Sequence, residues 1–344
     1  MSAIPAVNET APETPRANGA LAALFARIAR GTERPILAIN DAAQEKDNQA
    51  PAFYCVHSLS GAGGTDFSHL ATSMPAVRFY GIQAPPTKMK DPAFSESVDA
   101  IASYYADALI KFQPTGPFLL GGWSAGAIIG LEIAQKLRAR GRMVRLYAAI
   151  DAAPENTSGS LPYWHPHYAV EFAFNALGWF VNDVVMTKGS LRAFFRRGLN
   201  KAKARRKSFI GRRGGSEETI DVDAVDTFMD ISRYADYERS FMNRLYVALV
   251  SYKAKKYAGA VVAYEAKKKP LLHLPQVARV WRAIAPRSTI VRLKGTHLSI
   301  LQPGDVNALA TDLQKRLIAV AADLMDHEAP PPEMPVSELE QKTA

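Results

Sequence analysis

The sequence predicts an α/β protein with a mostly parallel central sheet and helices on both of its faces. Short apolar runs typical of strands alternate with helical patterns over residues 51–153, and the same alternation returns over residues 257–326. Parallel strands must be joined by crossover connections, which helices usually supply, so this order favours a parallel sheet. Between residues 154 and 256 the alternation gives way to long helical, aromatic and charged segments, which we interpret as a large helical insertion.

Each element of the core has its own local signal. Apolar runs rich in β-branched and aromatic residues predict strands at 53–56, 77–82, 118–120, 144–150, 261–264 and 289–293, and helical spacing predicts helices at 95–112, 125–140, 276–284 and 305–322. Residues 1–50 are largely polar or rich in Pro and Ala, so we expect a flexible arm with one short helix at 20–29. Residues 327–344 contain three consecutive prolines and no apolar face, which predicts a disordered tail.

Composition narrows the class of protein. The chain has 344 residues, 48% of them hydrophobic, and its single cysteine excludes a disulfide scaffold and every metal site built from several cysteines. No run of about 18 uncharged apolar residues predicts a membrane-spanning helix, and the N-terminus lacks a secretory signal, so we expect a cytoplasmic protein. The formal charge of +9 admits an acidic partner.

A candidate nucleophile lies where strand 118–120 turns into helix 125–140. The segment from Gly122 to Gly126 fits the pattern G-x-S-x-G, and a strand, a sharp turn and a helix are the context that this pattern requires. The turn exposes the serine hydroxyl with the helix N-terminus behind it, where backbone N–H groups stabilise negative charge. We therefore predict that Ser124 attacks the substrate; a glycine-rich turn with a solvent-facing serine is the alternative.

A serine nucleophile needs a histidine base and an acid that orients the base. His297 follows the last predicted strand at the carboxyl edge of the sheet, and the order serine, acid, histidine along the chain requires a late histidine. Asp151 directly follows strand 144–150, the next strand after the nucleophile helix, and is the preferred acid. Glu265 at the end of the following strand is the rival, but three lysines at 267–269 indicate a solvated, charge-paired turn there.

The tetrahedral intermediate of acyl transfer needs two backbone N–H donors. One should be the N–H of Ala125, directly after the nucleophile, and the other should come from the glycine-rich turn at residues 57–64, after the first core strand. Glycines in that turn let the backbone approach a substrate closely. The turn does not match a dinucleotide-binding loop, because Asp66 stands where the third glycine of that pattern belongs.

Taken together, these segments resemble the thioesterase domains of polyketide and nonribosomal peptide synthases. The resemblance covers residues 50–322 without the middle of the insertion, and it is carried by residues 53–61, 80–84, 122–126, 151, 280–281 and 295–301. It implies an α/β-hydrolase fold, a triad of Ser124, Asp151 and His297, and an oxyanion hole formed by the Leu59 and Ala125 N–H groups. The chain departs from the family at His57-Ser58, where many members carry a proline-bearing turn.

The resemblance also implies a substrate and a mechanism. The substrate is an acyl, polyketide or peptidyl chain, thioester-linked to phosphopantetheine on a carrier protein that acts in trans or in cis of a larger synthase. An acyl-Ser124 intermediate forms and is released by hydrolysis or cyclisation. No cofactor or metal of the protein's own is expected, because phosphopantetheine comes with the substrate.

In that family the segment after the acid's strand forms a helical lid over an acyl channel, the role that we expect for residues 154–256. Residues 163–180 hold seven aromatic side chains. An aromatic-lined channel suits an extended apolar chain. Tyr163, Trp164, Phe172 and Trp179 are therefore candidates to line it, and packing of the lid onto the core is the alternative role for each of them.

The insertion also contains the strongest charge run of the chain. Residues 196–215 carry nine Lys and Arg and no acid, and subtracting them from +9 leaves the rest of the chain formally neutral. Carrier proteins are usually acidic, so Arg205, Arg206 and Lys207 are candidates for carrier docking, with a solvated flexible loop as the alternative. Nucleic-acid binding is disfavoured because aromatic side chains are hardly interleaved with these charges.

Three functions therefore remain open on the sequence alone. The first is a carrier-protein thioesterase with a serine nucleophile. The second is a small-molecule esterase or amidase of the same fold that acts on free substrates. The third is a catalytically silent fold that binds an acidic partner through its basic segment.

Overall fold

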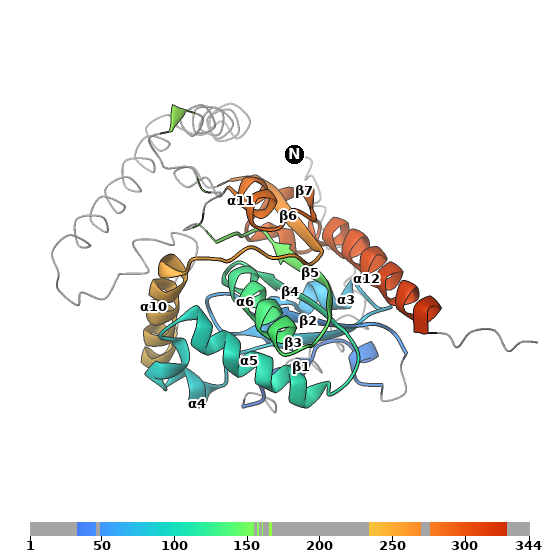
Figure 1. Ribbon diagram of the computed structural model, residues 1–344. Coiled ribbons are helices and arrows are strands. Elements are labelled where there is room, and N and C mark those ends of the chain that lie inside the picture. Colours follow the sequence, from blue (N-terminus) through green and yellow to red (C-terminus); the bar gives the residue numbers. More distant parts are fainter. Residues whose placement is uncertain are drawn as a thin grey trace, which may run out of the picture.

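The computed structural model describes residues 33–45, 49–154, 157, 160, 165–166, 234–269 and 276–328. Within them, one seven-stranded sheet has the strand order β1-β3-β2-β4-β5-β6-β7 (Figure 1). β1 runs antiparallel to β3, and every other neighbouring pair is parallel. The strands are β1 (Ile36–Ala38), β2 (Ala52–Val56), β3 (Arg78–Ile82), β4 (Phe118–Trp123), β5 (Val144–Ile150), β6 (Val261–Lys268) and β7 (Ser288–Thr296).

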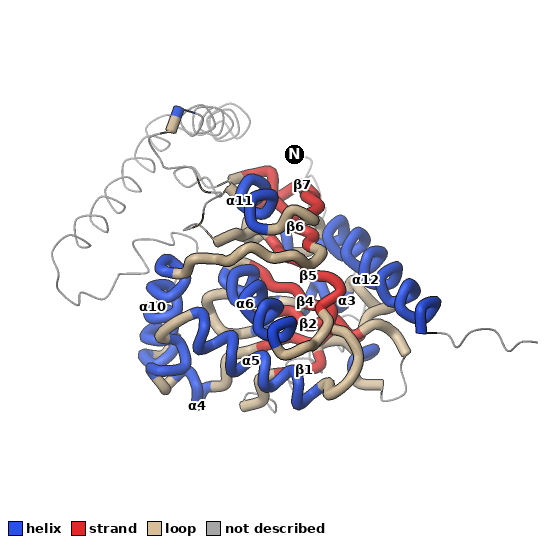
Figure 2. Tube along the Cα trace, viewed as in Figure 1, coloured by secondary structure: helices blue, strands red, loops and turns tan. Residues whose placement is uncertain are grey.

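Helices cover both faces of this sheet, so the molecule has three layers (Figure 2). One face packs against α5, α6, α10 and α11, and the other packs against α3 and α12. The α-helices are α2 (Gly63–Asp66), α3 (Ser68–Thr72), α4 (Pro86–Met89), α5 (Val98–Phe112), α6 (Ala125–Ala139), α10 (Asp236–Ser251), α11 (Val277–Ile284) and α12 (Val306–Glu328), and short 3-10 turns lie at Asp41–Ala43, Pro92–Ser95 and Ser299–Leu301. This architecture confirms the predicted α/β class.

The central strands are apolar on both sides because both sides are covered. In β2, Tyr54 and Val56 belong to the core under α5 and α6, whereas Phe53 and Cys55 belong to the core under α3 and α12. Strands of a parallel sheet covered on both faces have this near-continuous hydrophobic character. The sheet is therefore a rigid frame, and the carboxyl ends of β2, β4, β5, β6 and β7 meet along one edge.

The structure differs from the sequence-based expectation in the N-terminal segment. Residues 36–38 lie in the predicted flexible arm 1–50, but they form β1 at the edge of the sheet, with Ile36 and Leu37 buried. The side chain of Asn40 donates hydrogen bonds to the carbonyls of Ala71, Met74 and Val77 and accepts one from Phe79 N–H. A polar side chain therefore anchors this segment to the core instead of facing solvent.

Two elements extend further than predicted, and several other predictions concern residues that the structure does not describe. β6 continues to Lys268 instead of ending at 264, and α12 reaches Glu328, so residues 327 and 328 of the expected tail are helical. Of the predicted insertion 154–256, the described part contains α10. The predicted helix 20–29, the channel candidates Tyr163, Trp164, Phe172 and Trp179, the docking candidates Arg205, Arg206 and Lys207, and residues 329–344 lie outside the described residues.

Among the helices of the described segments, none combines the length and the apolar character that crossing a membrane requires.

Candidate active site

The predicted nucleophile turn is a strained, tightly packed elbow between β4 and α6. Ser124 has φ 56° and ψ −124°, a left-handed backbone that non-glycine residues seldom adopt. A Cβ at Gly122 would lie 2.1 Å from the Gly126 carbonyl oxygen, and a Cβ at Gly126 would lie 2.1 Å from the Val56 carbonyl oxygen. The two glycines of G-x-S-x-G are therefore required by close backbone contact, which holds the half-buried Ser124 at the end of β4.

Asp151 and His297 lie together at the carboxyl edge of the sheet. Asp151 follows β5 with φ 52°, and it and Ser124 are the two non-glycine residues with positive φ in the described part of the chain. Its Oδ2 accepts a hydrogen bond from His297 Nδ1 at 2.9 Å, and its Oδ1 accepts one from Ala266 N–H at 2.7 Å. The Asp151 side chain is 6% exposed and that of His297 is 25% exposed. The bond at Nδ1 leaves the Nε2 lone pair of His297 able to take a proton.

Trp123, the residue before the elbow serine, connects His297 to the elbow. Its indole Nε1 donates to the His297 carbonyl at 3.2 Å, and the two rings stack with centroids 5.2 Å apart. The second position of the pentapeptide tolerates many residue types, so the motif gave no reason to select this tryptophan. Since Trp123 and Ser124 are adjacent in the chain, the stack places the imidazole beside the elbow.

The loop that carries His297 is tied to the start of α12. Thr296 N–H donates to Ser299 Oγ at 2.9 Å, and Ser299 Oγ in turn donates to Asp305 Oδ2 at 2.5 Å. Gly295 has φ 99°, and a Cβ there would lie 2.4 Å from the same Asp305 oxygen. These contacts define the path of the backbone on which His297 stands.

The rival acid Glu265 occupies a different environment from the one predicted. It lies inside β6, 4% exposed, and not in a solvated turn. Charge pairing was expected, and it is present: Glu265 Oε2 is 3.0 Å from Arg292 Nε on β7, and Oε1 is 3.1 Å from Lys269 Nζ. Because both carboxylate oxygens face cations, Glu265 is engaged in an ion-pair network and His297 is bonded to Asp151.

The turn after β2 lies directly against the first turn of α6. A Cβ at Gly126 would lie 2.1 Å from the Val56 carbonyl oxygen and 2.5 Å from the His57 carbonyl oxygen, and Ala125 directly precedes this glycine. Within the part of the chain that the structure describes, neither Leu59 N–H nor Ala125 N–H donates a hydrogen bond. Two unengaged backbone donors at one edge of the sheet fit an anion or a developing oxyanion.

His57 lies at the same edge but is a core residue. It is fully buried, and burial lowers the pKa of its imidazole to about 4. Both of its ring nitrogens are hydrogen-bonded, Nδ1 to the Ser58 carbonyl at 2.5 Å and Nε2 to the Tyr105 hydroxyl at 2.7 Å. A neutral, fully hydrogen-bonded imidazole is not a candidate base for Ser124.

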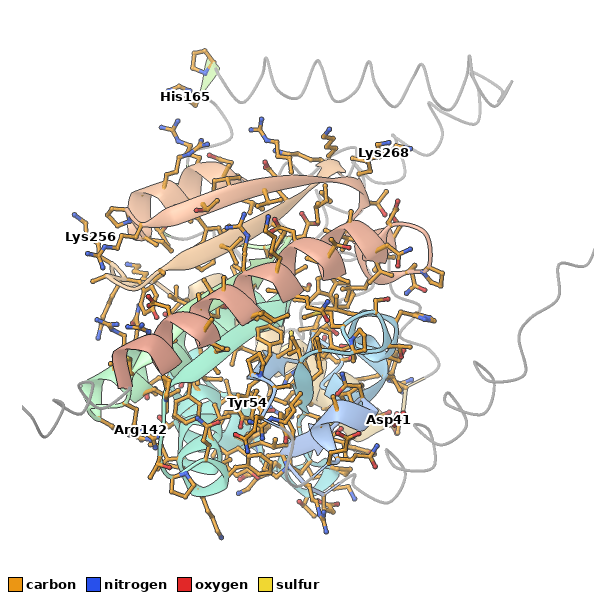
Figure 3. All side chains as sticks on the ribbon, turned by 90° about the vertical axis from the view of Figure 1, so that its right-hand side faces the viewer. Asp41, Tyr54, Arg142, His165, Lys256 and Lys268 are labelled. Carbon is orange, nitrogen blue, oxygen red and sulfur yellow. The ribbon has the colours of Figure 1, made fainter. Side chains whose placement is uncertain are left out.

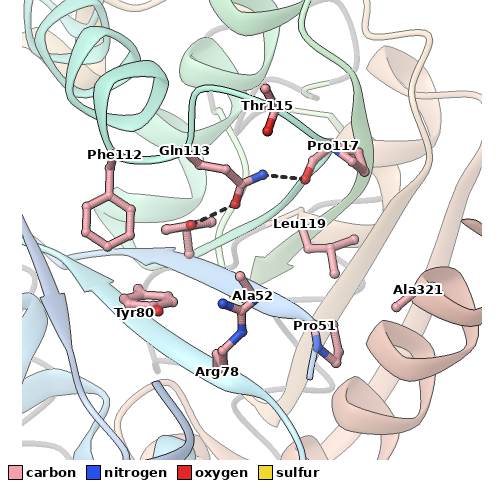
Figure 4. A pocket seen from close by; sticks show the side chains of 11 residues that line it. Pro51, Ala52, Arg78, Tyr80, Phe112, Gln113, Thr115, Pro117, Leu119 and Ala321 are labelled. Carbon is pink, nitrogen blue, oxygen red and sulfur yellow. Dashed lines mark hydrogen bonds between the residues drawn. The ribbon is translucent and has the colours of Figure 1, made fainter. Parts of the chain in front are cut away.

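A pocket of about 380 Å³ lies at the opposite edge of the sheet, at the amino ends of β2, β3 and β4 (Figure 4). Its polar groups largely bond one another: Gln113 accepts from Tyr54 OH at 2.8 Å and donates to the Pro117 carbonyl at 2.8 Å. Arg78 Nε donates to the Ala50 carbonyl at 2.7 Å. None of the candidate catalytic residues lines this pocket, so the pocket is not part of the candidate active site.

Within the described residues, no group of three or more His, Cys, Asp or Glu side chains could hold a metal ion.

The sequence is similar to short segments of large synthases. The non-reducing polyketide synthase cla3 of Cladosporium cladosporioides is 34% identical over 105 residues, which make up 29% of this chain and 5% of that protein. The polyketide synthase PksR of Bacillus subtilis (strain 168) is 34% identical over 92 residues, 27% of this chain and 4% of that protein. The chain thus spans about one twentieth of the length of these curated relatives.

Solved structures show a similar fold, and one family model matches most of the chain. The NocB thioesterase domain from the nocardicin cluster has a TM-score of 0.51 at 17% identity, covering 82% of this chain and 98% of that one. The four-domain nonribosomal peptide synthetase AB3403 has a TM-score of 0.53 at 20% identity, covering 85% of this chain and 21% of that one. At these identities the likeness concerns the fold. The thioesterase domain family matches residues 51–317. The chain therefore belongs to the thioesterase-domain family, a family of hydrolases, and has the α/β-hydrolase fold.

Proposed function

We propose that this chain is a serine thioesterase that releases an acyl, polyketide or peptidyl chain from a phosphopantetheinyl carrier protein. The observation that carries the proposal is the 2.9 Å bond between Asp151 and His297, at the sheet edge where the strained Ser124 elbow lies. Strained backbone at two adjacent strand ends persists only where the surrounding structure over-determines it, and it is concentrated at functional sites.

In the first half-reaction Ser124 becomes acylated. His297 Nε2 accepts the proton of the Ser124 hydroxyl as Oγ attacks the thioester carbon, and Asp151 holds the imidazole tautomer and stabilises the imidazolium. The carbonyl oxygen becomes an oxyanion that accepts hydrogen bonds from the Leu59 and Ala125 N–H groups. The C–S bond then breaks. His297 returns the proton to the departing sulfur, and pantetheine leaves as the thiol.

In the second half-reaction the acyl-Ser124 ester is released. His297 takes a proton from water, or from a nucleophile within the bound chain, and that oxygen or nitrogen attacks the ester carbon through the same oxyanion hole. Ser124 Oγ leaves with the proton. Water gives hydrolysis, and an internal nucleophile gives cyclisation. Neither half-reaction needs a cofactor of the protein's own.

Positive charge near the site suits an acidic carrier protein, and the described residues contribute such charge. Residues 257–304 contain eight Lys and Arg and one acid, so this stretch has a formal charge of +7 that acids elsewhere in the chain balance. Lys267, Lys268, Arg292 and Lys294, all exposed, stand near the carboxyl ends of β6 and β7. Figure 3 labels Lys268 at the end of β6. We name these four residues the basic edge and propose that it contributes to carrier docking.

A comparison of two substrates tests the proposal. Turnover of an acyl chain on phosphopantetheine of an acyl or peptidyl carrier protein should exceed turnover of the p-nitrophenyl ester of the same acid, measured as kcat/KM. The carrier protein can be supplied in trans or as part of a fused chain. A clear preference for the free ester would instead support the small-molecule esterase. Absence of turnover and of fluorophosphonate labelling with either substrate class would support a silent binding fold.

A further inference from the structure

Two buried side chains outside the proposed triad converge on the turn that supplies one oxyanion donor. His57 follows β2 and Tyr105 lies in the middle of α5, and neither side chain is accessible to solvent. The Tyr105 hydroxyl is 2.7 Å from His57 Nε2, and His57 Nδ1 is 2.5 Å from the Ser58 carbonyl oxygen. The mechanism above uses neither residue, yet both belong to one chain of hydrogen bonds that ends on the backbone of the turn.

The direction of each hydrogen bond follows from the groups involved. A carbonyl oxygen can only accept, so His57 Nδ1 carries the ring proton and donates it to Ser58. The buried imidazole is neutral at working pH, because burial lowers its pKa to about 4. Its Nε2 therefore has a lone pair, to which the Tyr105 hydroxyl donates. Tyr105 thus stabilises the one neutral tautomer of His57 that can donate to the turn.

The Ser58 carbonyl and the Leu59 N–H belong to the same peptide group. Because that group is planar and trans, fixing the direction of its C=O fixes its N–H in the opposite direction. The Ser58 oxygen accepts from His57 Nδ1 and also from Gly61 N–H at 3.2 Å, so two donors hold it on the inner side of the turn. The Leu59 N–H consequently points outward and donates to no described group.

We propose that His57 and Tyr105 are positioning residues that hold the Ser58–Leu59 peptide with its N–H directed at the oxyanion. If this peptide rotated, the site would present a carbonyl oxygen to the developing negative charge instead of a donor. Such a rotation replaces attraction by repulsion in the transition state and leaves the binding of the uncharged substrate largely unaffected. This inference rests on the proposed function and on Leu59 as the second donor.

The test compares three variants with wild type on one acyl-pantetheine thioester. His57→Leu removes the donor to Ser58, His57→Asn keeps an N–H close to the position of Nδ1, and Tyr105→Phe removes the donor to Nε2. Tyr54→Phe is the matched control, because it also deletes the hydroxyl of a buried tyrosine, which bonds the half-buried Gln113, but at the opposite edge of the sheet. Each variant is measured for kcat, KM, thermal midpoint and the inhibition constant of an alkylboronic acid, whose tetrahedral anion mimics the oxyanion.

We expect His57→Leu to lower kcat by about 10- to 100-fold, somewhat less than direct loss of an oxyanion donor, with little change in KM. The affinity of His57→Leu for the boronic acid should fall by a similar factor. His57→Asn should recover most of the loss, Tyr105→Phe should show a smaller loss of the same kind, and Tyr54→Phe should lower only the thermal midpoint. If Tyr105→Phe and Tyr54→Phe lower the thermal midpoint to a similar extent and leave kcat and boronate affinity intact, His57 and Tyr105 contribute only to packing of the core.

The same series keeps this inference separate from the proposed function. Turnover by wild type and its loss in Ser124→Ala test whether the chain is a serine thioesterase. If those results hold while all His57 and Tyr105 variants keep wild-type kcat and boronate affinity, the positioning role is wrong and the thioesterase stands.

Discussion

Ser124 and Asp151 share an uncommon backbone conformation, and the neighbouring strand holds each of them. Ser124 N–H donates to the Ile150 carbonyl at 3.1 Å, and Asp151 N–H donates to the Tyr264 carbonyl at 2.8 Å. A residue in such a sparsely populated conformation costs about 1–3 kcal/mol, so the flanking strands must supply that stability. β4, β5 and β6 thereby act together to present the serine and the carboxylate at one edge of the sheet.

Two carboxylates near that edge should respond in opposite ways to neutralisation. Asp151→Asn removes the charge that orients and stabilises protonated His297, so kcat should fall by about 10²- to 10⁴-fold. Glu265→Gln is the matched control: it breaks the ion pairs to Arg292 and Lys269, and should lower the thermal midpoint but leave kcat near wild type. Steady-state kinetics and melting curves distinguish them; a larger kcat loss in the glutamate variant would exchange the two roles.

His57 should also leave a signature in the pH dependence of stability. Its pKa is lowered from 6.5 to about 4 in the folded protein, so the unfolded chain binds more protons between these values. Stability from this group is therefore complete above pH 6.5 and is lost as the pH falls towards 4, by about 3 kcal/mol in total. In urea unfolding at several pH values, His57→Asn should lack this part of the acid destabilisation. An unchanged difference between pH 7 and pH 4.5 would contradict the buried, neutral histidine.

The contact between α6 and the turn after β2 is the element-level feature on which the site depends. Gly126 allows the helix to meet the Val56 and His57 carbonyls without an intervening Cβ. This contact sets the separation between the Leu59 and Ala125 N–H groups, and so the width of the proposed oxyanion hole. A helix that starts a few tenths of an ångström further out would separate the two donors.

Adding a single methyl group there should therefore impair both folding and activity. In Gly126→Ala the new Cβ would lie 2.1 Å from the Val56 oxygen, so the helix must shift, and we expect a lower thermal midpoint and a kcat reduced by about 10-fold or more. Gly141→Ala is the control: its φ of 74° makes alanine unfavourable, by about 1 kcal/mol, but no atom lies within 4 Å. Loss of stability without loss of kcat in both variants would show that the contact does not shape the site.

Elements with strong local signals were predictable, and elements that depend on distant partners were not. The elbow could be placed from five residues because glycine spacing, strand and helix are all local. β1 could not, since three residues at a sheet edge carry no periodicity and its anchor, Asn40, bonds carbonyls more than 30 positions away. The environment of Glu265 also depends on distant partners. Three adjacent lysines suggested a solvated turn, whereas β6 continues past this residue and Glu265 is buried beside Arg292 of β7.

In the candidate site, too, residues with a local sequence signal were predictable and residues that depend on distant partners were not. Ser124, Asp151 and His297 could be selected because each comes within a few residues of the end of a predicted strand, and their catalytic roles remain predictions. Trp123 and the His57–Tyr105 pair could not be selected, because their partners come from the loop after β7 and from α5, and no spacing rule relates them. The departure at His57-Ser58 was visible in the sequence, but its consequence required the geometry of the Ser58 carbonyl.

Over the molecule as a whole, the net charge of +9 reflects an uneven distribution and not a uniformly basic surface. Subtracting residues 196–215 leaves a formally neutral remainder, but within that remainder residues 257–304 carry +7. The basic edge therefore lies in the part of the chain that forms β6, α11 and β7, beside the loop that carries His297. Charge at this position can steer an acidic macromolecule towards the site.

Reversing charge on the basic edge should affect only substrates delivered by a carrier protein. Lys267→Glu combined with Lys268→Glu should lower kcat/KM for an acyl-carrier protein by about 10-fold at low salt, mainly through KM, and the difference should shrink as ionic strength rises. Turnover of a free pantetheine thioester should not change. The control, Lys111→Glu with Lys315→Glu, alters the net charge equally on α5 and α12. Equal losses in both double variants would assign the effect to net charge and not to docking.

The proposed mechanism depends on acylation of Ser124, which intact-mass spectrometry under rapid quench can detect. Wild type mixed with an acyl-pantetheine thioester should gain the mass of one acyl group in place of a hydrogen. Fragmentation should locate it on Ser124, and Ser124→Ala should show neither adduct nor turnover. An adduct on a different residue, or turnover of the thioester at the wild-type rate by Ser124→Ala, would contradict the account.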